Sequence, residues 1–277
     1  MDLSGAVAVV TGAGSGIGRE LALQFSRQGS RLAINDANAD TLQETCRLVE
    51  AAGGTVIGRA FDVSDNDAML AFAEQVQQEY GQVDIVVNNA GVSLGVMGAD
   101  EIPREDFEWV VNINLWGVIN GSMAFLPMLR SRPAASLVNV SSSFGLMGVP
   151  LQAPYCASKF AVRGFTESIR LELLDTNICV TLVYPSRVRT NILRNGRHRD
   201  EATKEELVRL FEERVSRINP TDMAQAIIRG IVGRKEEILY GRSAKIYSFV
   251  SRFVPRFVVK AAARRGLRKI DQNQKTS

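Results

Sequence analysis

Short apolar runs alternate along the chain with amphipathic stretches of a dozen or more residues. Such runs are typical of buried strands, and the longer stretches are typical of helices with one apolar face. Because the runs are apolar throughout, we expect helices on both faces of a parallel sheet. The pattern predicts a doubly wound α/β sheet of about seven strands in one domain, residues 1–241. The predicted strands are residues 6–10, 31–35, 55–61, 84–87, 136–140, 178–183 and 237–240.

Two segments depart from this alternation. Residues 190–218 are charged and have a helical pattern, where the alternation calls for an apolar strand. We therefore expect a helical lid over the rim of the sheet. Residues 220–232 again predict a helix, with Pro220 at its start, before the last strand. Residues 242–277 form the second departure, a basic C-terminal helical tail.

The tail has apolar and basic positions that each recur every four residues. On a helical wheel the apolar set covers about half of the circumference, although Pro255 predicts a break. Such a helix fits packing against another subunit or the lid, which we favour, or contact with an anionic membrane surface. The repeating positions are Phe249, Phe253, Phe257, Val250, Val254, Val258, Arg252, Arg256 and Lys260.

The net charge of +3 is the sum of two regions of opposite sign. Residues up to Gly241 carry 23 Lys and Arg against 29 Asp and Glu, giving −6, and the remainder carries 10 against 1, giving +9. The body therefore has no positive field that would attract nucleic acid, and we expect no nucleic-acid partner.

Cysteine and histidine are scarce. Three cysteines without a CxxC pair, and His198 as the one histidine, predict no metal site and suit a reducing compartment. No uninterrupted apolar run approaches the roughly 18–20 residues of a spanning helix, and the start has no signal-peptide pattern. We expect a cytoplasmic protein, with peripheral membrane contact through the tail as the alternative.

The first predicted strand runs into the sequence TGAGSGIG at residues 11–18, and an amphipathic helix follows. Glycines at such a turn let a pyrophosphate approach the N–H groups of the helix start. The common GxGxxG spacing fails here, and the spacing is TGxxxGxG instead. It resembles the short-chain dehydrogenase/reductase family, which has a Rossmann-like fold. The resemblance implies cofactor contacts at Gly12, Ser15, Gly16, Ile17 and Gly18.

Asp36 follows the second predicted strand, 18 residues after Gly18. A carboxylate there accepts hydrogen bonds from the adenosine ribose hydroxyls and repels a 2′-phosphate, which favours NAD. NADP stays an alternative, because Arg19 and Arg59 could lie nearby. A capping role for Asp36 in the next helix is the simpler reading of the residue alone.

Other family landmarks occur in order along the chain. The resemblance implies an adenine contact at Asp62 and Val63, and a segment beneath the cofactor after the fourth strand, with Asn88 as its structural member. It also implies a nicotinamide contact after the sixth strand, where Ser186 replaces the usual glycine. The cofactor contacts in these two later segments are Asn89, Ala90, Gly91, Pro185, Val188 and Thr190.

The resemblance implies a catalytic set of Ser142, Tyr155, Lys159 and Asn114. Tyr155 and Lys159 are four residues apart and so share a helix face, and Ser142 ends a strand. Tyrosine is a proton donor and acceptor whose pKa an adjacent ammonium lowers, and serine would position the substrate oxygen. Asn114 matches the family residue that holds a water connecting the lysine to solvent. Tyr155 and Lys159 also contact the cofactor.

The predicted substrate contacts are Ser142, Leu94, Met147 and Ser186, in segments that are mostly apolar. They predict an apolar secondary alcohol or ketone, although half of the apolar side chains there could instead pack inward. Arginines near the lid could bind an anionic substrate, but a solvated loop balanced by Asp200, Glu201, Glu205 and Glu206 is the simpler reading.

The expected function is therefore NAD(P)-dependent oxidoreduction, in a homodimer or homotetramer. The alternative is a nucleotide-binding regulatory or scaffold protein of the same family without turnover.

Overall fold

The computed structural model describes residues 1–254, apart from the side chains of Glu212 and Arg214. The strands are β1 (Val7–Thr11), β2 (Arg31–Asp36), β3 (Val56–Ala60), β4 (Ile85–Asn88), β5 (Ala135–Val140), β6 (Ile178–Tyr184) and β7 (Glu237–Leu239). The α-helices are α1 (Gly16–Arg27), α2 (Ala39–Ala51), α3 (Asn66–Tyr80), α4 (Arg104–Val111), α5 (Gly117–Arg130), α6 (Ala153–Glu172), α7 (Glu201–Leu210), α8 (Pro220–Val232) and α9 (Arg242–Phe253). Three shorter helical turns are η1 (Asn112–Trp116), η2 (Ser143–Gly145) and η3 (Phe211–Val215).

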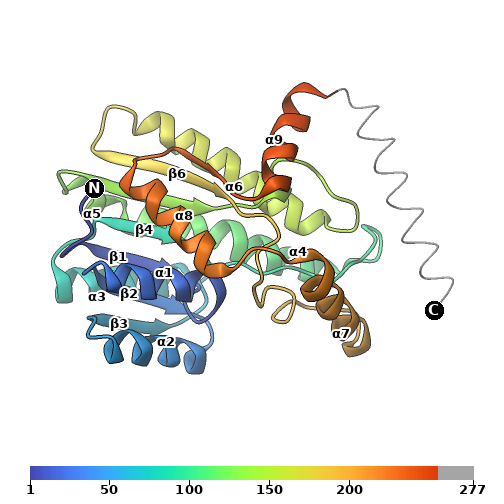
Figure 1. Cartoon of the computed structure of the whole chain (residues 1–277), viewed down its shortest axis with the longest axis horizontal. Coiled ribbons are helices and arrows are strands. Elements are labelled where there is room, and N and C mark those ends of the chain that lie inside the picture. The colour runs from blue at the N-terminus through green and yellow to red at the C-terminus, as the bar shows by residue number, and fades with distance from the viewer. Residues whose placement is uncertain (255–277) are drawn as a thin grey trace.

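The strands form one seven-stranded sheet in the order β3-β2-β1-β4-β5-β6-β7, with every neighbouring pair parallel (Figure 1). The order reverses direction between β1 and β4, which defines a doubly wound sheet. The predicted fold class is therefore confirmed.

Alternate residues of the central strands serve the two faces of the sheet. Ala8 and Val10 of β1 pack in a cluster with α1, α2 and α8. Val7 and Val9 pack in a second cluster with side chains of α3 and α5. Two buried apolar layers explain why the strands have no polar face, as expected for a parallel sheet.

Helices α4 and α5 join through the π-helical turn η1 into one helix, Arg104–Arg130, whose length and composition would suffice to cross a membrane. Polar residues such as Asn112 and Asn114 interrupt this helix, so it contains no apolar run of spanning length and the expectation based on such runs did not indicate it. Asn114 and Asn120 lie buried on this helix, and α5 packs on the sheet through Phe125 and Leu129. It is therefore placed as a core helix.

The lid segment leaves the sheet after β6 and returns before α8. Val188 bridges Ile218, and the Arg189 N–H donates to the Ile218 carbonyl at 2.9 Å, so the two ends of the excursion are fastened together. Helix α7 lies within it, beyond the carboxyl ends of the strands (Figure 1).

The first part of the predicted tail packs on the body. Ala244 of α9 is fully buried, in a cluster with Tyr184 of β6. The opposite face of α9 exposes Ile246, Phe249 and Phe253. Other positions of the predicted tail pattern lie outside the described residues, namely Pro255, Arg256, Phe257, Val258 and Lys260.

Candidate active site

The glycine turn after β1 and the segment after β4 meet at the carboxyl ends of these strands. The Thr11 hydroxyl accepts the backbone N–H groups of Asn89 (3.0 Å) and Ala90 (3.1 Å), and the Asn89 side chain donates to the Thr11 carbonyl at 2.9 Å. Ligands of doubly wound sheets bind in the crevice at this point, where the strand order reverses.

The turn leaves no room for side chains at several of its positions. Gly12 and Gly16 have φ values of +66° and +54°, in the left-handed region that favours glycine. A Cβ on Gly18 would lie 2.0 Å from the Gly12 carbonyl oxygen. The three glycines of the TGxxxGxG spacing are thus required by the local geometry.

Helix α1 begins at Gly16 with Ser15 as its N-cap residue. Within the described residues the Ser15 side chain makes no capping hydrogen bond, so the first backbone N–H groups of α1 can donate to a bound anion. The Ile17 side chain packs against the core, which leaves its backbone N–H as the group for a cofactor contact.

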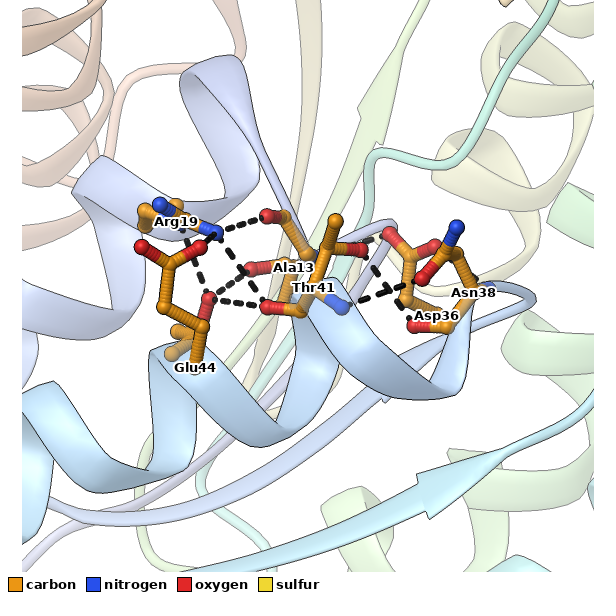
Figure 2. A network of polar contacts seen from close by, with 8 residues as sticks. Ala13, Arg19, Asp36, Asn38, Thr41 and Glu44 are labelled. Atoms are coloured by element: carbon orange, nitrogen blue, oxygen red, sulfur yellow. Dashed lines mark hydrogen bonds and ion pairs between the residues drawn. The ribbon is translucent and has the colours of Figure 1, made fainter.

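Asp36 ends β2 beside the glycine turn. One carboxylate oxygen accepts the Gly14 N–H at 2.8 Å, and the other accepts the Asn38 N–H at 2.9 Å. Each oxygen keeps a second lone pair for a hydroxyl donor. The Arg19 guanidinium, one of two cations considered for a 2′-phosphate, pairs instead with Glu44 of α2 (Figure 2).

Asp62 and Val63 follow β3. Oδ1 of Asp62 accepts the Ser64 N–H at 2.9 Å and the Ser64 hydroxyl at 2.8 Å, which closes a local turn. Val63 is buried, and its carbonyl accepts the Asn120 side chain at 3.1 Å. The predicted adenine contact would therefore use the other oxygen of Asp62 and the N–H of Val63.

The segment after β4 passes directly over the catalytic candidates. A Cβ on Gly91 would lie 3.0 Å from Oδ1 of Asn114 and 3.2 Å from Nζ of Lys159. Asn88 points elsewhere, since its side chain donates to Asn139 of β5 at 2.9 Å. It joins the two strands rather than lining the crevice.

Ser142, Tyr155 and Lys159 lie together beyond the carboxyl end of β5. Ser142 is the N-cap of η2, where its Oγ accepts the Phe144 N–H at 3.2 Å, and its side chain lowers the pKa of Tyr155. Nζ of Lys159 is 5.8 Å from the Tyr155 ring centroid. The Phe144 ring lies edge-on to the Tyr155 ring, with 6.0 Å between the ring centroids. The sequence motifs did not predict this contact.

Burial changes the acidity of both titratable members. It raises the pKa of Tyr155 to about 12, against a lowering by the Ser142 hydrogen bond. It lowers the pKa of Lys159 to about 8, and the ammonium donates to the Val140 carbonyl at 3.0 Å. The Ser141 hydroxyl donates to the Lys159 carbonyl at 2.8 Å, which fixes α6 against β5. At neutral pH the phenol keeps its proton and the lysine is mostly charged.

Asn114 is fully buried in the π-turn η1. Its Oδ1 accepts the Val92 N–H at 2.8 Å, and its Nδ2 donates to the Val92 carbonyl and the Ser158 hydroxyl, both at 3.0 Å. The side chain therefore connects the segment after β4 to α6. The predicted water would therefore bind the backbone carbonyl of Asn114. This carbonyl lies in a π-helical turn, a type of turn that often marks functional sites.

The segment after β6 reaches the glycine turn. Thr190 lies against Gly16, where an added Cβ would come within 3.2 Å of the threonine side chain. The Pro185 carbonyl accepts the Ser143 N–H at 3.0 Å, and Val188 is buried. The structure thus brings this segment beside both the turn and η2.

Serine replaces the usual glycine at position 186, and its backbone φ is not in the left-handed region that favours glycine. The residue with positive φ is Arg187, at +55°. Ser186 is buried, and its Cβ lies 3.3 Å from where a Cβ on Gly241 would be. These contacts run toward the start of α9 rather than toward Tyr155, so nothing here supports Ser186 as a substrate contact.

The apolar side chains predicted to face substrate divide into two groups. Leu94, Met97 and Leu146 are buried, and Leu94 packs in a small cluster with Val110 of α4. Leu94 thus packs largely inward, and the substrate contact at Leu94 stays a prediction. Val96, Met147 and Leu151 are at least partly exposed.

The lid arginines pair with a different segment from the one expected. Arg197 forms an ion pair with Asp106 at 2.8 Å and lies 4.4 Å from the Trp109 ring centroid, and Arg199 pairs with Glu101 at 2.8 Å. The ion-pair partners of Arg197 and Arg199 thus come from outside the lid, although Asp200 of the lid also interacts electrostatically with Arg199. Asp200 caps α7, accepting the Thr203 N–H at 2.7 Å.

The crevice fits a dinucleotide. A Cβ at Gly12, Gly14 or Gly18 would fill the cradle or collide with its walls, and the start of α1 offers N–H groups to phosphate. The Asp36 carboxylate lies beside the glycine turn and can accept a hydrogen bond from a ribose hydroxyl. The catalytic candidates lie at the opposite end of the same rim, and among the described residues no cluster suits a metal ion.

Comparisons with known proteins agree with this geometry. The family described as "short chain dehydrogenase" matches residues 6–201. The "Putative oxidoreductase SadH" of Mycobacterium tuberculosis is 38% identical, over 90% of this chain and 91% of that protein. "Epidermal retinol dehydrogenase 2" of Homo sapiens is 39% identical, over 69% of this chain and 63% of that protein. The crystal structure of a short chain dehydrogenase/reductase from Burkholderia phymatum in complex with NAD has a TM-score of 0.79 at 32% identity, covering 86% of this chain and 89% of that one.

Proposed function

The chain belongs to the short chain dehydrogenase family, and on that premise we propose that it transfers hydride between NAD and an apolar secondary alcohol or ketone. The observation that carries the proposal is the grouping of Ser142, Tyr155 and Lys159 beyond the carboxyl end of β5, with Lys159 next to Gly91 in the segment after β4. Such a group exchanges a proton at the substrate oxygen.

The nicotinamide, when bound, supplies or accepts the hydride at the substrate carbon. This chain would hold the cofactor by the glycine turn, by Asp36 at the ribose, by the segment 89–91 and by Thr190. NAD is favoured because the Asp36 carboxylate opposes a 2′-phosphate, and NAD is the cofactor in the Burkholderia phymatum structure. NADP is the alternative, because Arg59 on the edge strand β3 could pair with its 2′-phosphate.

Tyr155 is the proton donor for ketone reduction. Its raised pKa keeps the phenol protonated at neutral pH, and Ser142 holds the substrate oxygen against it. As hydride reaches the carbon, the phenol proton passes to the oxygen and the nearby Lys159 ammonium stabilises the phenolate. The reverse transfer serves alcohol oxidation. A buried, intact set of this kind argues against the alternative of a nucleotide-binding protein without turnover.

An apolar substrate suits the side chains beside Tyr155. The Phe144 ring lies edge-on to the phenol, and Met147 and Leu151 are partly exposed in the same loop. The human relative is named for retinol, an apolar alcohol. The Phe144 to Leu151 loop is thus our candidate for the substrate wall.

A second copy of the chain would cover exposed apolar side chains of α5 and α6. Met123 of α5 and Phe160 and Leu171 of α6 are exposed to between 41% and 67%, and Leu174 follows just after α6 at 61%. These side chains support the expected homodimer or homotetramer. We place the protein in the cytoplasm, and regard protein packing as the first explanation of the exposed face of α9.

The proposal is tested with a panel of apolar alcohols and ketones, assayed with NAD and with NADP. We expect turnover with NAD, and a loss of about 10³-fold in kcat for Tyr155→Phe, in the range that general acid–base groups contribute. Tyr80→Phe is the matched control, since the Tyr80 hydroxyl donates to the Leu32 carbonyl, far from the crevice. Turnover that survives in Tyr155→Phe would refute the role of the phenol.

A further inference from the structure

Arg19 lies one turn into α1, and its guanidinium is surrounded by acceptors. It donates to the Gly14 carbonyl at 2.6 Å and to the Thr41 carbonyl at 3.2 Å, and its Nε donates to the Thr45 hydroxyl at 3.0 Å. Its charge is paired with Glu44 at 2.5 Å (Figure 2). Among the described residues, Glu44 is the one carboxylate in an ion pair with it.

Gly14 stands between two opposite charges. Its N–H donates to the Asp36 carboxylate and its carbonyl accepts from Arg19. Thr41 closes the space on the α2 side, since a Cβ on Gly14 would lie 2.4 Å from its hydroxyl. The proposed ribose position at Asp36 and the Arg19 cation are therefore separated by a single residue of backbone.

This proximity bears on the choice between the two cofactors. A 2′-phosphate at Asp36 would carry up to two negative charges, and a free guanidinium so close would attract it. The Arg19 side chain is only 22% exposed and is held by three acceptors besides Glu44, so its charge stays in place whether or not Glu44 neutralises it. Glu44 supplies the neutralising charge from α2.

We propose that Glu44 is a cofactor-specificity residue, which disfavours the 2′-phosphate by pairing with Arg19. The inference rests on the proposed function, because it assumes that the adenosine ribose lies at Asp36. With Arg19 neutralised, the Asp36 carboxylate presents a negative charge to the ribose. Glu44 is a positioning residue in this arrangement, because it acts on the 2′-phosphate through the charge of Arg19.

The test measures dissociation constants of NADH and NADPH for the full chain by calorimetric titration, without turnover. For Glu44→Gln we expect NADPH to bind about fivefold more tightly, as one uncompensated charge in a partly solvated site would produce, and NADH to change less than twofold. For Arg19→Gln we expect the opposite sign for NADPH. Glu44→Asp should keep the discrimination of the original chain.

Glu50→Gln is the matched control, because it removes one exposed carboxylate from the same helix. Melting temperatures of all variants separate loss of fold from loss of specificity. An equal weakening of both cofactors in Glu44→Gln, or an unchanged ratio, would overturn the proposal by showing a purely structural pair. Failure of the original chain to bind either nucleotide would instead refute the proposed function, and this inference with it.

Discussion

The glycine turn and the lid lie on the same rim of the sheet but are held in different ways. The turn is fixed by backbone, since a Cβ on Gly12 would lie 2.7 Å from the Ala90 Cα, and one on Gly18 still closer to Gly12. The lid is fastened by backbone hydrogen bonds at its two ends and at Arg197, and between these points surface ion pairs such as Arg197 on Asp106 hold it. Steric constraint makes one region rigid and intolerant of change, whereas exposed ion pairs of about 0–1 kcal/mol leave the other able to open.

The strongest way to test this contrast is Gly18→Ala. The new Cβ would collide with the Gly12 carbonyl, so the turn must move. We expect NADH affinity to fall about 100-fold, which corresponds to the ~3 kcal/mol of a severe overpacking. Gly164→Ala, in open space on α6, is the control and should leave affinity unchanged. Equal binding by Gly18→Ala would contradict a rigid cradle.

The pH dependence of ketone reduction tests the rigid part of the site. The pKa of Lys159 is lowered to about 8, so its ammonium is present below that pH and is lost above it. We expect kcat for reduction to fall by up to about tenfold per pH unit above about 8, since the phenolate loses its stabilising charge. A profile that stays flat to pH 10 would exclude this role for Lys159.

A milder change should open the lid. Asp106→Asn removes the ion pair with Arg197 and leaves the lid sequence intact. We expect trypsin to cut within residues 191–200 about threefold faster, the effect of an ion pair of about 0.7 kcal/mol. Glu108→Gln is the control on the same helix, because Glu108 pairs only locally with Arg104. Equal cleavage in both variants would mean that the lid is held by something else.

The smallest effect should come from shortening the tail. A chain ending at Gly241 loses the buried Ala244 and the packing of Tyr247, worth about 1–3 kcal/mol, and should melt several degrees lower. A chain ending at Val254 keeps α9 and should melt higher than the chain ending at Gly241. Vesicle flotation of the full chain and the Val254 chain then asks whether the remainder binds lipid, and equal flotation would remove that idea.

The sheet and the cofactor crevice were predictable because their constraints are local. Apolar runs determine the strands. The glycine spacing of the turn, which includes Gly18, can be read directly from the sequence. Ser142, Tyr155 and Lys159 were identified through the family resemblance, which their spacing on one strand end and one helix face matches.

The parts that could not be predicted depend on contacts between distant residues. Leu94 and Val96 are both apolar, and only the packing of α4 buries one and leaves the other exposed. The partners of Arg197 and Arg199 come from a segment about 90 residues away in the chain. The left-handed residue next to Ser186 proved to be Arg187, because the backbone there pairs with the returning end of the lid.

The central claim is that this chain transfers hydride while Tyr155 supplies the proton. The most direct measurement uses NADH with deuterium at the transferable position and an apolar ketone, with mass analysis of the alcohol formed. The account predicts deuterium at the carbinol carbon for the original chain, and about 10³-fold less product for Tyr155→Phe with NADH affinity unchanged. Product without deuterium, or full product from Tyr155→Phe, would contradict it.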